Sequence, residues 1–349
     1  MQYNVIGLMS GTSLDGLDIA CCGFTPGEDR WSFTIGCAET IPYTGQWKKI
    51  LASIESGTAL EFVTADTGYG HLLGRLAREF IGKHGIQPDF IASHGHTIFH
   101  QPEKGITCQI GCGAAIAAET GLRVICDFRS QDVALGGQGA PLVPIGDKLL
   151  FGDFTFCLNL GGFANISCDH ADRRIAYDIS PANIVLNHLA RQAGYEYDPE
   201  GMMAKGGSIN QPLLDIFNAL PYYHLDFPKS LGKEWVIQHI HPLLTASKLP
   251  VNDLLATFCE HIAMQVARAT QGKRGSSMLV TGGGAFNRFL VERIRHLCSP
   301  EIILPDNLTI NYKEALIFAF LGLRRWRNEA NCLRSVTGAA TDSSSGAIY

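Results

Sequence analysis

The chain has 349 residues, 46% of them hydrophobic and 17% charged, and a formal net charge of −5. This length suits two domains that each bury an apolar core, and the composition is that of an ordinary globular protein. The slightly acidic balance offers no positive field for nucleic acid, and no apolar run is long enough to span a membrane. We therefore expect small-molecule partners rather than nucleic acid or a membrane.

Eleven cysteines are scattered along the chain without any CxxC pair. An odd number without framework spacing predicts reduced, buried thiols in a cytoplasmic protein. The N-terminus lacks a basic region, and four polar residues interrupt its first apolar run: Ser10, Thr12, Ser13 and Asp15. No signal peptide is expected.

The first predicted unit is a hairpin with a polar tip. Residues 5–9 and 17–24 are apolar strand runs, and residues 10–16 form a loop rich in hydroxyl groups and glycine. A tight turn that needs Gly and Asp only for its geometry would explain this loop. Alternatively, its backbone N–H groups bind an anionic ligand.

A predicted helix over 61–84, ended by Gly85, is followed by a strand over 88–92. The strand brings several histidines to a strand end, where open α/β sheets carry their sites: His94, His96 and His100. No acidic or cysteine partner has metal-site spacing, so substrate contact or a structural role is favoured over metal binding.

A glycine-rich stretch over 130–144 follows a short strand at 123–126. It is the best candidate for a domain boundary. Three polar side chains nearby could hold sugar hydroxyls or a carboxylate: Arg129, Asp132 and Gln138. A flexible linker with solvated charges explains the composition equally well.

A second hairpin spans 156–167, with the turn Gly161-Gly162 between its strands. Asp178 follows, just before a predicted helix in which Ser180 is the N-cap and Pro181 the first helical residue. A turn that can cradle phosphate, followed by an acid at a helix start, suits phosphoryl transfer. A carboxylate near a helix N-terminus is also expected to stay ionised.

The two hairpins form a weak internal repeat with a long period, and together they could hold the phosphates of one nucleotide. No GxxxxGK[ST] motif occurs, so a P-loop is excluded. Further on, a helix over 252–271 precedes a strand and the run Gly282–Gly284, which could accept a flat ring or serve only close packing. Strands alternate with helices in both halves, which predicts two α/β domains around a cleft.

Several motifs together resemble the anhydro-N-acetylmuramic acid kinase family. They are MSGTSLDG at 9–16, SHGHT at 93–97, DFR at 127–129, ALGGQGAPLVP at 134–144, NLGGFAN at 159–165, YD at 177–178 with PAN at 181–183, PKS at 228–230 and TGGGAFN at 281–287. The first and fourth strings are specific, and the motifs cover nearly the whole chain in order.

The resemblance implies two actin-like, ribonuclease H-like domains that flank an interdomain cleft holding ATP and Mg²⁺. We place the N-terminal domain at 1–135 and the C-terminal domain at 136–349. The C-terminal tail is a candidate to complete the N-terminal domain. The resemblance also implies a reaction in which water opens a 1,6-anhydro bridge while O6 takes the γ-phosphoryl group, giving N-acetylmuramic acid 6-phosphate and ADP in cell-wall recycling. The family further suggests a homodimer.

The resemblance assigns roles to individual residues. Asp178 matches the general base, and Glu314 matches a glutamate near the sugar. His94, Thr97 and Arg129 match substrate contacts, and Asp15 is the candidate for holding Mg²⁺ through water. The nucleotide contacts would be Gly11, Thr12, Ser13, Leu14, Asp15, Gly16, Leu17 and Asp18 in the first loop, Asn159, Gly161, Gly162 and Asn165 in the second, and Gly282, Gly283 and Gly284 at the adenosine.

This chain departs from the family pattern at a few positions. The family usually has Gln at His96, Thr-Gly at Ile179-Ser180, and Thr and Arg around 231–233, where Leu231, Gly232 and Lys233 stand. These positions fall on predicted sugar-side loops, so two alternatives stay open: a kinase for another anhydrosugar such as levoglucosan, and a catalytically silent nucleotide-binding or sugar-binding protein.

Overall fold

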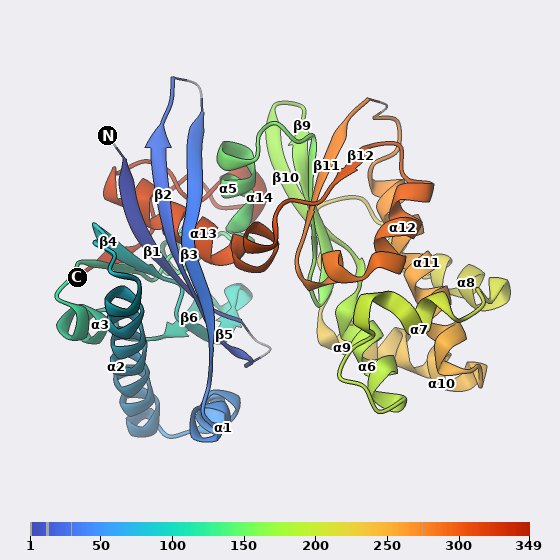
Figure 1. Cartoon of the computed structure of the whole chain (residues 1–349), viewed down its shortest axis with the longest axis horizontal. Coiled ribbons are helices and arrows are strands. Elements are labelled where there is room, and N and C mark those ends of the chain that lie inside the picture. The colour runs from blue at the N-terminus through green and yellow to red at the C-terminus, as the bar shows by residue number, and fades with distance from the viewer. Residues whose placement is uncertain (1, 12–13, 29, 274) are drawn as a thin grey trace. The chain divides into compact units, whose positions relative to one another are not determined.

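The computed structural model describes residues 2–11, 14–28, 30–273 and 275–349. The chain forms two compact units, each with its own mixed sheet and helices (Figure 1). The first unit combines Met1–Leu150 with Tyr312–Tyr349, and the second is Phe151–Asn311. The first unit is therefore discontinuous in sequence.

The sheet of the first unit has the strand order β13-β7-β4-β1-β2-β3. Its strands are β1 (Tyr3–Ser10), β2 (Gly16–Pro26), β3 (Trp31–Pro42), β4 (Phe90–Ser93), β7 (Val124–Cys126) and β13 (Ala347–Ile348). The first three form an antiparallel meander, whereas β4 pairs with β1 and β7 with β4 in parallel. A separate antiparallel hairpin consists of β5 (His96–Gln101) and β6 (Ile106–Ile110).

Successive side chains of β1 point to opposite faces of this sheet. A long helix packs on each face. Ile6 and Leu8 pack in one apolar cluster with Tyr69 and Leu73 of α2 (Ala59–His84). Gly7, between them, lies against α13 (Asn307–Trp326), where a Cβ would overlap the carbonyl of Ala315. The absence of a side chain at this one position therefore lets α13 approach the sheet closely.

The sheet of the second unit has the order β10-β9-β8-β11-β12. Its strands are β8 (Phe156–Leu160), β9 (Phe163–His170), β10 (Arg173–Pro181), β11 (Ser277–Thr281) and β12 (Glu301–Ile303). The main core packs side chains of β8 against three helices: α6 (Asn183–Gln192), α11 (Val251–Ala269) and α12 (Arg288–Leu297). The regularly spaced apolar side chains of these segments thus form the core of this unit.

Shorter elements complete the two units. In the first they are α1 (Gly45–Ser53), α3 (Gly113–Thr120), α4 (Ser130–Ala134), α5 (Val143–Leu150) and α14 (Arg334–Thr337), with 3-10 turns at Ile54–Ser56 and Pro102–Lys104. In the second they are α7 (Met202–Lys205), α8 (Gln211–Asn218), α9 (Lys233–His239) and α10 (His241–Ser247), with 3-10 turns at Pro199–Gly201, Pro221–His224 and Gly283–Phe286.

Both units repeat one strand order. An antiparallel meander of three strands is extended, on the side of its first strand, by two parallel strands: β3-β2-β1-β4-β7 in the first unit and β10-β9-β8-β11-β12 in the second. The prediction of a duplicated actin-like α/β fold is confirmed by this repeat.

The units divide between Leu150 and Phe151, whereas the sequence analysis placed the boundary between residues 135 and 136. Helix α5 belongs to the first unit because it is anchored to α13. Its Asp147 forms a buried ion pair with Lys313 at 2.7 Å, and its Gly146 packs against Ile317. The stretch 130–144 contains helix α4 and hydrogen bonds to its own unit, so it is not a flexible linker.

The predicted start of helix α6 is wrong. Ser180 and Pro181 belong to strand β10, and the helix begins at Asn183. The carbonyl of Gly161 accepts a hydrogen bond from the N–H of Asn183 at 3.1 Å, and that of Gly162 from Ala182 at 2.9 Å. Main-chain carbonyls of the glycine turn therefore satisfy the first amides of the helix, which the sequence analysis had assigned to a serine cap.

Candidate functional site

The first polar loop joins β1 to β2 in the first unit. Leu14 has a left-handed backbone with φ of 59°, and its N–H donates to the Gly11 carbonyl at 3.4 Å. Gly16 begins β2 against the carbonyl of Ile41, where a Cβ would overlap the oxygen. Leu17 is buried in the strand. Two predicted nucleotide contacts, Thr12 and Ser13, lie outside the described residues.

Two aspartates lie at the end of this loop and at the start of β2. Asp15 is exposed at the end of the loop, and Asp18, on β2, accepts a hydrogen bond from the Thr40 hydroxyl at 2.6 Å. Burial raises the pKa of Asp18, the hydrogen bond from Thr40 lowers it, and the charge of Asp15 raises it again. Exposed carboxylate oxygens suit Mg²⁺, which keeps several waters. In the described part of the chain, no three His, Cys, Asp or Glu side chains form a metal-binding group.

His94 and Arg129 form a hydrogen-bonded pair across 35 positions of sequence. Arg129 donates from Nε and Nη2 to His94 Nε2 at 3.2 and 2.9 Å, and from Nη1 to the Gly139 carbonyl at 2.6 Å. His94 Nδ1 lies 2.9 Å from the Gly95 carbonyl, so the neutral tautomer with a proton on Nδ1 satisfies both contacts. Burial, and then the charge of Arg129, hold the pKa of His94 well below its usual value.

Asp132 fixes the glycine-rich loop whose Gly139 carbonyl accepts the hydrogen bond from Arg129. This buried carboxylate accepts from the Gly139 N–H and the Thr337 hydroxyl, both at 2.8 Å. Gln138, predicted as a possible substrate contact, donates its main-chain N–H to the Thr337 carbonyl at 2.8 Å. Asp132 therefore ties the loop to the C-terminal part of the first unit.

His96 and Thr97 lie at the start of β5. His96 Nδ1 is 2.9 Å from the Ser10 hydroxyl at the end of β1, and Ser10 also accepts from the Tyr43 hydroxyl at 2.8 Å. Burial lowers the pKa of His96. Thr97 pairs with Gln109 next to an irregularity in the β5–β6 register. His96, one of the positions at which this chain departs from the family pattern, thus contacts Ser10 at the end of β1.

Glu314 follows the kink of α13, where Tyr312 leaves helical geometry with φ of −115°. Desolvation by surrounding protein raises the pKa of Glu314, and the charge of Asp18 raises it further, while Arg129 and Lys313 oppose the shift. The side chain nevertheless remains accessible to solvent. The first unit thus brings Asp18, Arg129 and Glu314 into one electrostatic group.

In the second unit, Gly161 and Gly162 form the turn between β8 and β9. Asn159 and Asn165 face each other directly across this hairpin. Gly282, at the end of β11, has φ of 82°, and a Cβ there would overlap Asn159 Oδ1. Gly284 is equally restricted, because a Cβ would lie 2.7 Å from Leu160 Cβ. The hairpin and the glycine run are therefore packed together.

Asp178 lies in β10, directly across from Asn165. Its Oδ2 accepts the Leu231 N–H at 2.9 Å. Burial raises the pKa of Asp178, and the hydrogen bond from Leu231 partly offsets that rise. The expectation that the start of a helix keeps this acid ionised is wrong, because α6 begins five residues later and the stabilising donor is a main-chain N–H of residue 231.

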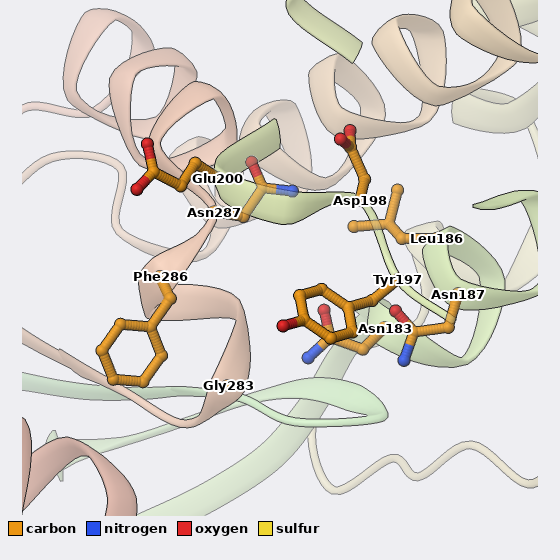
Figure 2. A pocket seen from close by; sticks show the side chains of 9 residues that line it. All are labelled: Asn183, Leu186, Asn187, Tyr197, Asp198, Glu200, Gly283, Phe286 and Asn287. Carbon is orange, nitrogen blue, oxygen red and sulfur yellow. The ribbon is translucent and has the colours of Figure 1, made fainter. Parts of the chain in front are cut away.

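A pocket with a volume of about 350 Å³ opens in the second unit beside the glycine run. Figure 2 shows the ring of Tyr197, the amides of Asn183 and Asn187, and Phe286 with Gly283 arranged around it. Leu186, Asp198, Glu200 and Asn287 complete the lining. Of these nine residues, the sequence analysis identified only Gly283 as a ligand contact. The signal available in the sequence was a pair of asparagines about one helical turn apart, Asn183 and Asn187.

Comparison with known proteins identifies the family. The family model described as anhydro-N-acetylmuramic acid kinase matches residues 3–349. The anhydro-N-acetylmuramic acid kinase of Vibrio parahaemolyticus is 34% identical, with 100% of this chain and 99% of that protein covered. That of a Sulfurovum species is 33% identical, with 99% and 98% covered. The chain belongs to the anhydro-N-acetylmuramic acid kinase family.

Membership of the anhydro-N-acetylmuramic acid kinase family confirms the resemblance drawn from the motifs. A solved activator of 2-hydroxyisocaproyl-CoA dehydratase from Clostridium difficile covers 93% of this chain and 97% of its own, at 14% identity and a TM-score of 0.42. That likeness is too loose to support any conclusion. Among the described residues, no helix has the length and apolar character needed to cross a bilayer.

Proposed function

We propose that this member of the anhydro-N-acetylmuramic acid kinase family uses ATP to convert 1,6-anhydro-N-acetylmuramic acid into N-acetylmuramic acid 6-phosphate and ADP. The observation that carries the proposal is the match to the family model over residues 3–349. Asp178, in the Tyr177-Asp178 motif, is the proposed general base. The acid is half-buried and hydrogen-bonded through Oδ2, which leaves Oδ1 as the oxygen to receive a proton.

The proposed reaction joins a hydrolysis to a phosphoryl transfer. Asp178 takes a proton from water as the water oxygen bonds to the anomeric carbon. The bond between that carbon and O6 breaks, and O6 forms a bond to the γ-phosphorus as ADP leaves. Because burial raises the pKa of Asp178, the carboxylate is a stronger base than an exposed aspartate, while the Leu231 N–H keeps it available in its ionised form.

The nucleotide would be shared between three glycine-containing segments. The pocket beside Gly282–Gly284 is of a size suited to adenosine, and Tyr197 and Phe286 offer flat surfaces for the base. The main-chain N–H groups around Gly161 and Gly162, and those of the loop from Gly11 to Asp18, are the proposed phosphate donors.

Asp15 would hold Mg²⁺ through water, with Asp18 in support, since both supply the oxygen atoms that this ion prefers. Bound there, the ion would neutralise phosphate charge during transfer. The proposed sugar contacts are His94, Thr97, Arg129 and Glu314. The guanidinium of Arg129, which is hydrogen-bonded to His94, is suited to bind an anionic substituent such as a lactyl carboxylate.

The test is to incubate the protein with Mg²⁺-ATP and 1,6-anhydro-N-acetylmuramic acid, with levoglucosan in a parallel reaction, and to follow ADP and phosphosugar by mass spectrometry. We expect a phosphorylated muramic acid that has gained one water, and little product from levoglucosan. Product from levoglucosan alone would overturn the substrate assignment, and no product from either sugar would overturn the proposed activity.

A further inference from the structure

One short stretch of the second unit holds Asp178 at three separate points. The Tyr222 hydroxyl donates to the Asp178 main-chain carbonyl at 2.7 Å, and the Asp178 N–H donates to the Lys229 carbonyl at 3.2 Å. The Leu231 N–H donates to the carboxylate at 2.9 Å. We call residues 222–231 the clamp segment. It fixes the backbone of the acid on both sides and one of its two carboxylate oxygens.

The ammonium group of Lys229 joins the two ends of the clamp segment. Its Nζ donates to the Leu225 carbonyl at 2.8 Å and lies 3.4 Å from the Tyr222 carbonyl. The same atom stands 4.9 Å from the centre of the Tyr222 ring and 5.9 Å from that of Tyr177, within the range of a cation–π interaction. Because residues 225–231 have no helix or strand, these contacts supply the order that a regular element would supply elsewhere.

We propose that Lys229 is a positioning residue for catalysis, which holds the clamp segment so that the Leu231 N–H stays on the carboxylate of Asp178. It acts through the main chain of its own segment, not by touching the substrate. The inference rests on the proposed function, because it concerns the general base of that reaction.

The proposal predicts how the pH dependence responds to loss of Lys229. The Leu231 N–H holds down a pKa that burial raises, so its departure raises the pKa of Asp178. The tyrosines around this acid stay protonated over the same range. Burial, then Asp178, raise the pKa of Tyr222 far above its usual value, and burial also raises that of Tyr177 to about 12. His261, on α11 behind Tyr223, has its pKa lowered by burial to about 3.

The experiment compares wild type with Lys229→Met, Lys229→Arg and, as a matched control, Lys205→Met, which removes an exposed lysine from α7 of the same unit. Hydrogen–deuterium exchange of the substrate-free proteins reports on the Leu231 amide. The pH profile of kcat/KM reports on Asp178.

In Lys229→Met we expect the Leu231 amide to exchange about tenfold or more faster. We also expect kcat to fall about 10- to 100-fold with little change in KM for ATP, and the acidic limb of the profile to move up by about one pH unit. Lys229→Arg should restore most of each value, because a guanidinium can reach the same carbonyls, and Lys205→Met should match wild type.

An unchanged exchange rate at Leu231, or an acidic limb that stays in place while kcat falls, would overturn the proposal. A rise in KM for the sugar alone would also overturn it, since that result would indicate direct substrate contact. The exchange measurement needs no turnover. If wild type phosphorylates neither sugar, the proposed function fails while the exchange result still decides whether Lys229 orders the clamp segment.

Discussion

The two units share a strand order but secure their functional groups in different ways. In the first unit, side chains hold side chains: Arg129 binds His94, Thr40 binds Asp18, and Ser10 binds His96. In the second unit, the main chain predominates. Asp178 is held by the N–H of Leu231, and the start of α6 is capped by the carbonyls of Gly161 and Gly162.

This difference predicts how each unit responds to substitution. A site held by side-chain partners loses its geometry when one partner is replaced, because a buried donor or acceptor is left without its bond. A site held by main-chain groups tolerates changes of side chain, except where the backbone needs glycine, where the side chain is the reacting group, or where, as we propose for Lys229, a side chain holds the segment that supplies the main-chain group. The following predictions test this contrast, starting with the largest effect.

Asp178→Asn should lower turnover of the anhydrosugar by roughly a thousandfold or more, since an amide cannot accept the proton from water. ATP binding should persist because the glycine segments are unchanged. Steady-state kinetics and nucleotide titration measure the two quantities. Unchanged turnover would show that Asp178 is not the base.

Arg129→Met should lower kcat/KM for the anhydrosugar by about 100-fold and destabilise the first unit by about 1–3 kcal/mol, because His94 Nε2 and the Gly139 carbonyl lose their donors. The pKa of His94 should rise, because the charge of Arg129, the second largest cause of its depression after burial, is removed. Kinetics, thermal unfolding and histidine NMR titration check these effects.

The matched control for Arg129→Met is Arg75→Met. Arg75 is an exposed residue of α2 whose nearest carboxylate oxygen, on Glu119, is 3.8 Å away, and exposed pairs contribute little. Equal losses in both variants would contradict the importance of the His94–Arg129 pair.

Gly282→Ala should raise KM for ATP about tenfold, because a Cβ overlaps Asn159 and shifts the glycine run from the hairpin. Gly272→Ala is the control. Gly272 has the same φ of 82° but open space around it, so it isolates the backbone cost of about 1 kcal/mol. If the two variants have the same KM for ATP, close packing at Gly282 is not what forms the nucleotide site.

Leu231→Thr should change turnover by no more than about twofold, because the group that contacts Asp178 is the N–H, which every residue but proline retains. Kinetics over pH 5–9 on a single preparation would check it. A tenfold change would show that the side chain itself contacts the substrate.

The sequence predicted those parts of the site that depend on local pattern. Apolar strands separated by glycine-rich turns located both hairpins, β1–β2 and β8–β9, and the alternation of strands and helices predicted two α/β domains. It also predicted α2, whose N-terminal capping box at Thr58 and left-handed Gly85 are features of local sequence. Strand β3 was missed, although its burial alternates along the chain as in a strand with one covered face.

The rest depends on contacts distant in sequence. Nothing in the spacing of His94 and Arg129 shows that they bond to each other. Ser180 and Pro181 satisfy the rules for a helix start, yet pairing with β9 continues through them, and the glycine turn supplies the cap instead. The role of Lys229 likewise requires knowing that the clamp segment folds back onto β10.

Because the first unit is discontinuous in sequence, its folding during translation must wait for the C-terminal segment. Strand β13 and most of α13 are encoded after the whole second unit, and α13 fills the face of the first sheet at Gly7. On the ribosome, the second unit can close its core while the nascent N-terminal sheet still exposes that apolar face. We expect the half of the protein that is translated first to be the last to become protease-resistant, and its early segments to depend most on chaperones.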